Sequence, residues 1–137
     1  MGLILDSSLL IAGERRGQRV WDILERVRAS QGETEAALSA VTVVELTHGI
    51  YRAKSQTDAQ RRRDFVDEVC ESIAVRPVTL EIARLAGRIE GEQAAKGITI
   101  ALPDLLIGVT ALDLGFSVAT LNLRHFQLIP GLSVVHL

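Results

Sequence analysis

Hydrophobic residues along this chain alternate between short unbroken runs and longer stretches with helical spacing. The run Leu3-Ile4-Leu5 is short and entirely aliphatic, as is typical of a parallel strand buried on both faces. From residue 80 to residue 96 the apolar positions recur at helical spacing, which predicts an amphipathic helix. The same patterns predict strands at residues 3–5, 37–40, 73–78, 116–120 and 132–135. They predict helices at residues 7–12, 19–28, 42–53, 59–71, 80–96 and 103–115.

Because strands and helices alternate, the pattern favours one central parallel β-sheet flanked by α-helices on both faces. Pro77 places the third strand at an edge, or at the end of a strand, since proline has no backbone N–H to donate. The chain has 137 residues and contains no internal repeat or low-complexity tract. That length is enough for one good core. We therefore expect a single α/β domain over residues 1–137.

Small and polar residues indicate where the helices begin and end. Ser7 and Ser8 can cap the first helix, and Gly13 is expected to end it. Thr42 and Glu45 have the spacing of a capping box, in which each side chain satisfies a backbone N–H of the other residue. On that interpretation Glu45 serves only to start its helix.

Composition and charge exclude few functions. Hydrophobic residues make up 47% of the chain and charged residues 23%, as in an ordinary globular protein. No stretch of about 18 apolar residues predicts a membrane span. Lys and Arg number 15 against 17 Asp and Glu, for a net charge of -2, so bulk charge does not indicate a nucleic-acid-binding protein. Any basic surface would have to be local.

The single cysteine and the first residues bear on location. Cys70 is the only cysteine, so no intramolecular disulfide can form. Its place in a predicted helix favours core packing over a nucleophilic role. The first residues lack the basic and apolar regions of a secretory signal, since Asp6 interrupts them at once. We expect a cytoplasmic, reducing location.

Three acidic residues stand in apolar surroundings, where an unpaired charge is costly to bury. Asp6 follows the first predicted strand, Glu45 comes one helical turn after the second, and Asp104 opens the helix that leads to the fourth. Asn122 follows the fourth strand closely. Ligand sites of parallel sheets lie beyond the carboxyl ends of the strands. Oxygen ligands of this kind suit Mg²⁺ or Mn²⁺, so a divalent metal site is the first hypothesis.

Four motifs surround these polar residues along the chain. They are Ile4-Leu5-Asp6-Ser7-Ser8, Ser39-Ala40-Val41-Thr42-Val43-Val44-Glu45-Leu46, Pro103-Asp104-Leu105-Leu106-Ile107 and Val118-Ala119-Thr120-Leu121-Asn122. In this order and spacing they resemble the PIN-domain family, with most similarity to the VapC-type toxins of toxin–antitoxin pairs. The resemblance covers nearly the whole chain, including its ending from His125 to Leu132.

The resemblance implies a metal-dependent endoribonuclease. Asp6 and Asp104 would be the direct Mg²⁺ or Mn²⁺ ligands, and Glu45 would bind a second ion or orient the attacking water. Ser8 and Thr120 match small polar positions that support such a site. Cleavage of RNA would leave a 5′-phosphate and a 3′-hydroxyl. The family also implies a homodimer and a cognate VapB-like antitoxin whose tail covers the acidic cleft.

The sequence departs from the family pattern at one position. Many relatives place a fourth acid where this chain has Asn122, or a few residues on, where it has His125. Asn122 can still offer a neutral oxygen ligand, while His125 is expected to be structural or exposed. One negative charge fewer should weaken a second ion more than the first. An alternative reading is therefore a PIN-like module that binds RNA or protein with little or no nuclease activity.

Basic residues provide a secondary clue about RNA. They cluster around the end of the third predicted helix, in the helix that follows and near the first loop, and they could flank an RNA path by neutralising phosphates. A solvated helix face, balanced in part by neighbouring acids, is the favoured interpretation. The basic residues concerned are Arg15, Arg16, Arg19, Arg52, Lys54, Arg61, Arg62 and Arg63. A phosphoacceptor signalling domain is disfavoured, since it expects an adjacent acidic pair and a late lysine that this chain lacks.

Overall fold

The computed structural model describes all residues 1–137 and contains one five-stranded sheet with seven helices. All neighbouring strands are parallel, in the order β3-β2-β1-β4-β5. The strands are β1 (Gly2–Leu5), β2 (Glu35–Ser39), β3 (Ala74–Arg76), β4 (Ser117–Thr120) and β5 (Val134–His136). The helices are α1 (Ser7–Arg15), α2 (Val20–Gln31), α3 (Ala40–Tyr51), α4 (Gln56–Ser72), α5 (Leu80–Ala94), α6 (Leu102–Leu114) and α7 (Leu123–Phe126).

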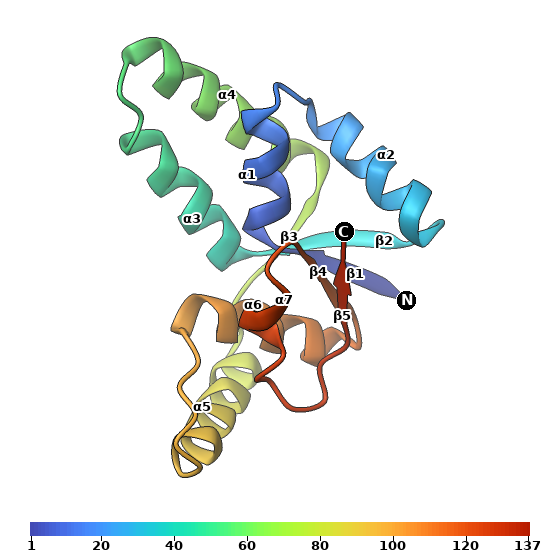
Figure 1. The fold of residues 1–137 in the computed structure, drawn as a ribbon, viewed down its shortest axis with the longest axis vertical. Coiled ribbons are helices and arrows are strands. Elements are labelled where there is room, and N and C mark those ends of the chain that lie inside the picture. The colour runs from blue at the N-terminus through green and yellow to red at the C-terminus, as the bar shows by residue number, and fades with distance from the viewer.

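Helices cover both faces of the sheet, as Figure 1 shows: α1 to α4 lie on one face and α5 to α7 on the other. The central strand supplies both cores by alternation, because successive side chains of a strand point to opposite faces. Leu3 and Leu5 belong to the core under α1 to α4, and Ile4 to the core over α5 to α7. The predicted α/β fold with helices on both faces is thereby confirmed. None of the seven helices has the length and hydrophobicity that a membrane-spanning helix needs.

Two predictions about helix ends were wrong. Gly13 does not end the first helix, because α1 continues to Arg15. Gly13 is buried instead, and a Cβ built there would lie 2.4 Å from Cδ1 of Ile23 in α2. Thr42 and Glu45 form no capping box, since α3 already begins at Ala40, where the Ser39 hydroxyl accepts the Val41 N–H at 3.1 Å. Glu45 is therefore free for another role.

Other differences are local. The short helix α7 was not predicted, and the third strand covers only residues 74–76 of the expected 73–78. That strand is at the sheet edge, as Pro77 indicated. The prediction that Cys70 packs in the core was also wrong, because its side chain is exposed on α4. Its helix buries the neighbouring positions Val66 and Val69.

Candidate active site

The order of the strands reverses at the middle of the sheet. The chain passes from β1 to β2 and β3 on one side, then returns to place β4 and β5 on the other side of β1. Ligands of open α/β sheets bind at such a switch point, beyond the carboxyl ends of the strands. Asp6 follows β1 there, and its backbone N–H donates to the Ala119 carbonyl of β4 at 2.9 Å. This bond ties the two central strands together beneath the site.

Asp6 is held by hydroxyl groups and by no cation. Its side chain is only 4% exposed. Its Oδ2 accepts hydrogen bonds from Ser8 Oγ at 2.7 Å and from Thr120 Oγ1 at 2.8 Å. Ser8 Oγ also accepts the Leu121 N–H at 3.1 Å, and Thr120 Oγ1 accepts the Asn122 N–H at 2.8 Å. The loop after β4 therefore orients the two hydroxyls, and these fix the Asp6 carboxylate.

Glu45 projects from the second turn of α3, and its carboxylate is partly buried. Its Oε1 is a buried oxygen without a hydrogen-bond partner. Burial raises the pKa of Glu45, and the Ser7 hydroxyl beside the carboxylate offsets part of that effect. The negative charges of Asp6 and Asp104 raise the Glu45 pKa further. The sequence indicated only a capping role for Ser7, because spacing along the chain cannot show that it faces α3.

Asp104 lies in the first turn of α6, directly after Pro103. Its side chain is 19% exposed, and its Oδ2 is 3.4 Å from Nδ1 of His125 in α7. Burial raises the Asp104 pKa, His125 lowers it, and the Asp6 charge raises it again. His125 is therefore a neighbour of the acidic site, although its side chain is 54% exposed. The resemblance placed His125 near the position of a fourth acid, but its contact with Asp104 depends on the unpredicted helix α7.

The remaining site candidate, Asn122, takes part through its backbone. It occupies the position before α7, its side chain makes no capping hydrogen bond, and the residue is exposed. Its N–H is the group that bonds to Thr120. The side chain of Asn122 is thus directed to no partner, whereas a fourth acid at this position would add charge to the site.

The three carboxylates influence one another electrostatically, but they form no ready ligand cage. No group of three or more His, Cys, Asp or Glu side chains is arranged so that it could hold a metal ion together. The donor chemistry nevertheless fits a hard divalent cation, since the carboxyl groups are partly or wholly buried and repel one another. Within this set of three acids, Oε1 of Glu45 is the buried oxygen that has no hydrogen-bond partner.

Comparison with known proteins agrees with this arrangement. The PIN domain family matches residues 3–131. Ribonuclease VapC1 of Rickettsia felis is 31% identical over 137 residues, covering 98% of this chain and 96% of that protein. Ribonuclease VapC of Rickettsia bellii is 30% identical with the same coverage. A DNA-bound VapBC crystal structure from Salmonella typhimurium superposes with a TM-score of 0.81 at 25% identity, covering 99% of this chain and 98% of that one. The chain therefore belongs to the PIN-domain family, in the group of the VapC proteins.

Proposed function

We propose that this protein is a divalent-metal-dependent endoribonuclease that acts as the toxin of a toxin–antitoxin pair. The observation that carries the proposal is the meeting of Asp6, Glu45 and Asp104 at the switch point of the sheet, where the charges of Asp6 and Asp104 raise the Glu45 pKa. The similarity to VapC ribonucleases supports the RNA substrate. A bound Mg²⁺ or Mn²⁺ would polarise a phosphoryl oxygen of the RNA and lower the pKa of a bound water.

The chain's own residues have distinct parts in this proposal. Asp6 and Asp104 would hold the ion. Ser8 and Thr120 keep Asp6 in one orientation through their hydrogen bonds. His125 positions Asp104 from α7. These contacts restrict the movement of the Asp6 and Asp104 side chains.

Glu45 is proposed to orient the attacking water and to accept its proton. A base works best when its pKa lies near the working pH, and burial moves the pKa of Glu45 upward in that direction. The water oxygen forms the new bond to phosphorus, and the bond from phosphorus to the 3′ oxygen breaks. The products are a 5′-phosphate and a 3′-hydroxyl, and the leaving 3′ oxygen takes up a proton.

The first test is cleavage of RNA by the purified protein with Mg²⁺ or Mn²⁺. We expect Asp6→Asn and Asp104→Asn each to lower the rate by at least about 100-fold, because each removes a charge that would hold the ion. Asp113→Asn is the matched control, since Asp113 is an exposed acid on the same helix as Asp104. Equal cleavage by the wild type and both site variants would contradict the mechanism.

A second candidate function is a PIN-like module that binds RNA or protein without cutting it. The exposed Asn122 in place of an acid and the absence of a ready metal cage favour this candidate. Isothermal titration calorimetry separates the two. Binding of RNA with no heat of Mg²⁺ or Mn²⁺ binding supports the module, whereas ion binding that is abolished in Asp104→Asn supports the nuclease.

The proposed partners are a VapB-like antitoxin and a second copy of this chain. An antitoxin tail with a basic side chain would complement the acidic site, because the carboxylates there have no Lys or Arg partner. Co-expression with the neighbouring reading frame tests the first partner, and light scattering of the purified protein tests the second.

A further inference from the structure

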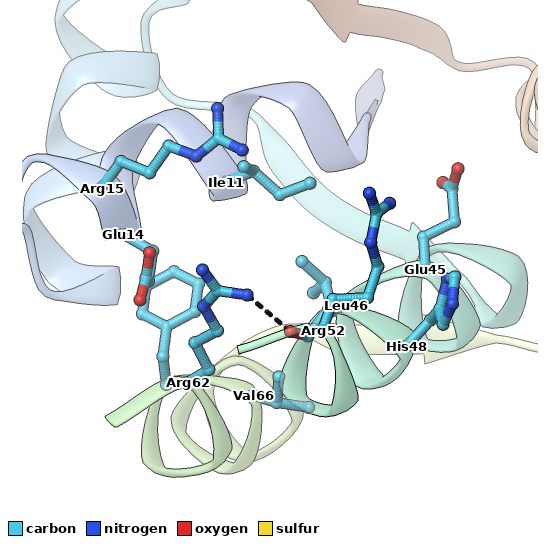
Figure 2. A pocket seen from close by; sticks show the side chains of 11 residues that line it. Ile11, Glu14, Arg15, Glu45, Leu46, His48, Arg52, Arg62 and Val66 are labelled. Carbon is cyan, nitrogen blue, oxygen red and sulfur yellow. Dashed lines mark hydrogen bonds between the residues drawn. The ribbon is translucent and has the colours of Figure 1, made fainter. Parts of the chain in front are cut away.

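A groove opens directly beside the acidic site. It lies between α1, α3 and α4, has a volume of about 280 Å³, and includes Glu45 in its lining. Figure 2 shows the Glu45 carboxylate at one side of the groove, with the side chain of Arg15 extending from α1 and that of Arg52 from the end of α3. Four residues of its lining are apolar, and we call them the floor of the groove: Ile11, Leu46, Phe65 and Val66.

The cations at this groove differ in whether they are already paired. Arg62 already has a partner within the protein, since its Nη1 donates a hydrogen bond to the Gly49 carbonyl at 2.6 Å (Figure 2). Arg61, which lies just outside, is 3.6 Å from Glu14 and 3.3 Å from Asp58. Arg15 and Arg52 form neither an ion pair nor a side-chain hydrogen bond. These two guanidinium groups are therefore available to an anion from outside.

Arg52 and Glu45 lie at different points along α3. Glu45 lies within α3, and Arg52 directly follows the last residue of that helix. Because the two residues are seven positions apart, they lie on the same side of the helix, two turns from each other. At 1.5 Å per residue this corresponds to roughly 10 Å along the helix. Arg52 thus lies along the groove from Glu45, beside the acidic site.

We infer that this groove is a subsite for one unpaired nucleotide of the RNA, next to the bond that is cut. Arg15 and Arg52 pair with its backbone phosphate, and its base lies on the floor of Ile11, Leu46 and Phe65. A nucleotide presents both an anion and a flat apolar surface, and bases of single-stranded RNA stack on aromatic and apolar side chains. The inference rests on the proposed nuclease function and adds the residues that position its substrate.

This assignment changes the interpretation of the basic residues. Arg61 and Arg62 of α4 are paired with acids or with the backbone, as a solvated helix face requires. Arg15 and Arg52 are the exceptions that line the groove. A duplex would not enter, because its bases are covered by pairing and cannot reach the floor between the helices.

The test compares Arg15→Gln, Arg52→Gln and the double variant with the wild type on a single-stranded oligoribonucleotide that the wild type cleaves. Arg84→Gln is the matched control, since Arg84 is an exposed residue of α5, on the other face of the sheet. We expect KM to rise roughly tenfold for each groove variant, with kcat nearly unchanged. The slope of log affinity against log salt should become shallower by about 0.7 for each phosphate that the variant no longer neutralises.

Three results would overturn the inference. One is cleavage by the double variant with the KM and salt slope of Arg84→Gln. A second is equal binding of the same oligoribonucleotide in a duplex. A third is an unchanged KM together with loss of inhibition by the co-expressed antitoxin, which would assign the groove to that protein. If the wild type itself neither binds nor cleaves RNA, the proposed function fails first. Melting curves of all variants verify that each is folded.

Discussion

The buried Glu45 carboxylate lowers the stability of the folded protein when it is charged. Its burial and the nearby charges of Asp6 and Asp104 raise its pKa. The folded protein therefore binds more protons than the unfolded chain between the ordinary glutamate pKa and the raised one. Stability must fall as pH rises through that window, because the unfolding free energy decreases wherever the native state holds the extra proton.

We expect Glu45→Gln to be more stable than the wild type at neutral pH and to show less of this decline. The measurement is the free energy of unfolding from urea titrations of metal-free protein in EDTA, from pH 4 to pH 8. Glu90→Gln is the control, because Glu90 is an exposed glutamate on α5. Parallel pH profiles for the wild type and Glu45→Gln would contradict this prediction.

A stabilised but inactive Glu45→Gln would also have a functional meaning. Strained or repelling groups are often kept at active sites at the expense of stability. The hydroxyls of Ser8 and Thr120 already satisfy Asp6. Glu45 has a partnerless buried oxygen instead, so it is the residue of the three with most to gain from an incoming ion or water.

At the scale of the element, α1 is positioned by a close approach to α2 at Gly13. Any Cβ there would meet Cδ1 and Cγ1 of the buried Ile23 at 2.4 and 2.7 Å. We predict that Gly13→Ala destabilises the protein by about 1–3 kcal/mol, since overpacking outweighs the gain in helix propensity. Because α1 begins directly after Asp6, a shift of this helix would also disturb the site.

Gly87→Ala is the matched control for this prediction. Gly87 is also within a helix, α5, but nothing lies within 4 Å of its built Cβ. Replacement there should stabilise the protein by up to about 1 kcal/mol, through helix propensity alone. Urea denaturation gives both values, and a stabilised Gly13→Ala would show that α1 and α2 have room to separate.

The same helix shows what a sequence can and cannot predict. Strands and helices follow from local hydrophobic spacing, and the position of Asp6 follows from where β1 ends, whereas the supporting role of Thr120 came from the resemblance to the PIN-domain family. Gly13 was misread as a helix end because its reason is a contact with Ile23 ten residues away. The start of α3 was misplaced because Ser39 and Thr42 are both good capping residues, and only the fold selects Ser39. The contact of His125 with Asp104 is tertiary and leaves no trace in spacing.

At the scale of the whole molecule, the strand order makes the site. The carboxyl ends of β1 and β4 are adjacent only because the chain returns across the sheet after β3. Asp6 then stands between hydroxyls from α1 and β4, while α3 and α6 each bring one acid toward it. The acids come from both faces of the sheet, α3 on one and α6 on the other (Figure 1). An ion held by Asp6 and Asp104 would link the end of the central strand β1 to α6 on one face of the sheet.

That link predicts a stability effect of metal on the entire fold. An ion that binds only the native state at 100 times its Kd adds about 2.7 kcal/mol, which for a chain of this length raises Tm by roughly 10 °C. The measurement is Tm in EDTA and in increasing Mg²⁺ or Mn²⁺, and it needs no RNA. Asp104→Asn should abolish most of the rise, because it removes one of the two carboxylates proposed to hold the ion, whereas Asp113→Asn, at an exposed acid on the same helix, should keep it. A Tm that does not respond to either ion would mean that the layers are held by the two hydrophobic cores alone and that the acids do not act as a metal site.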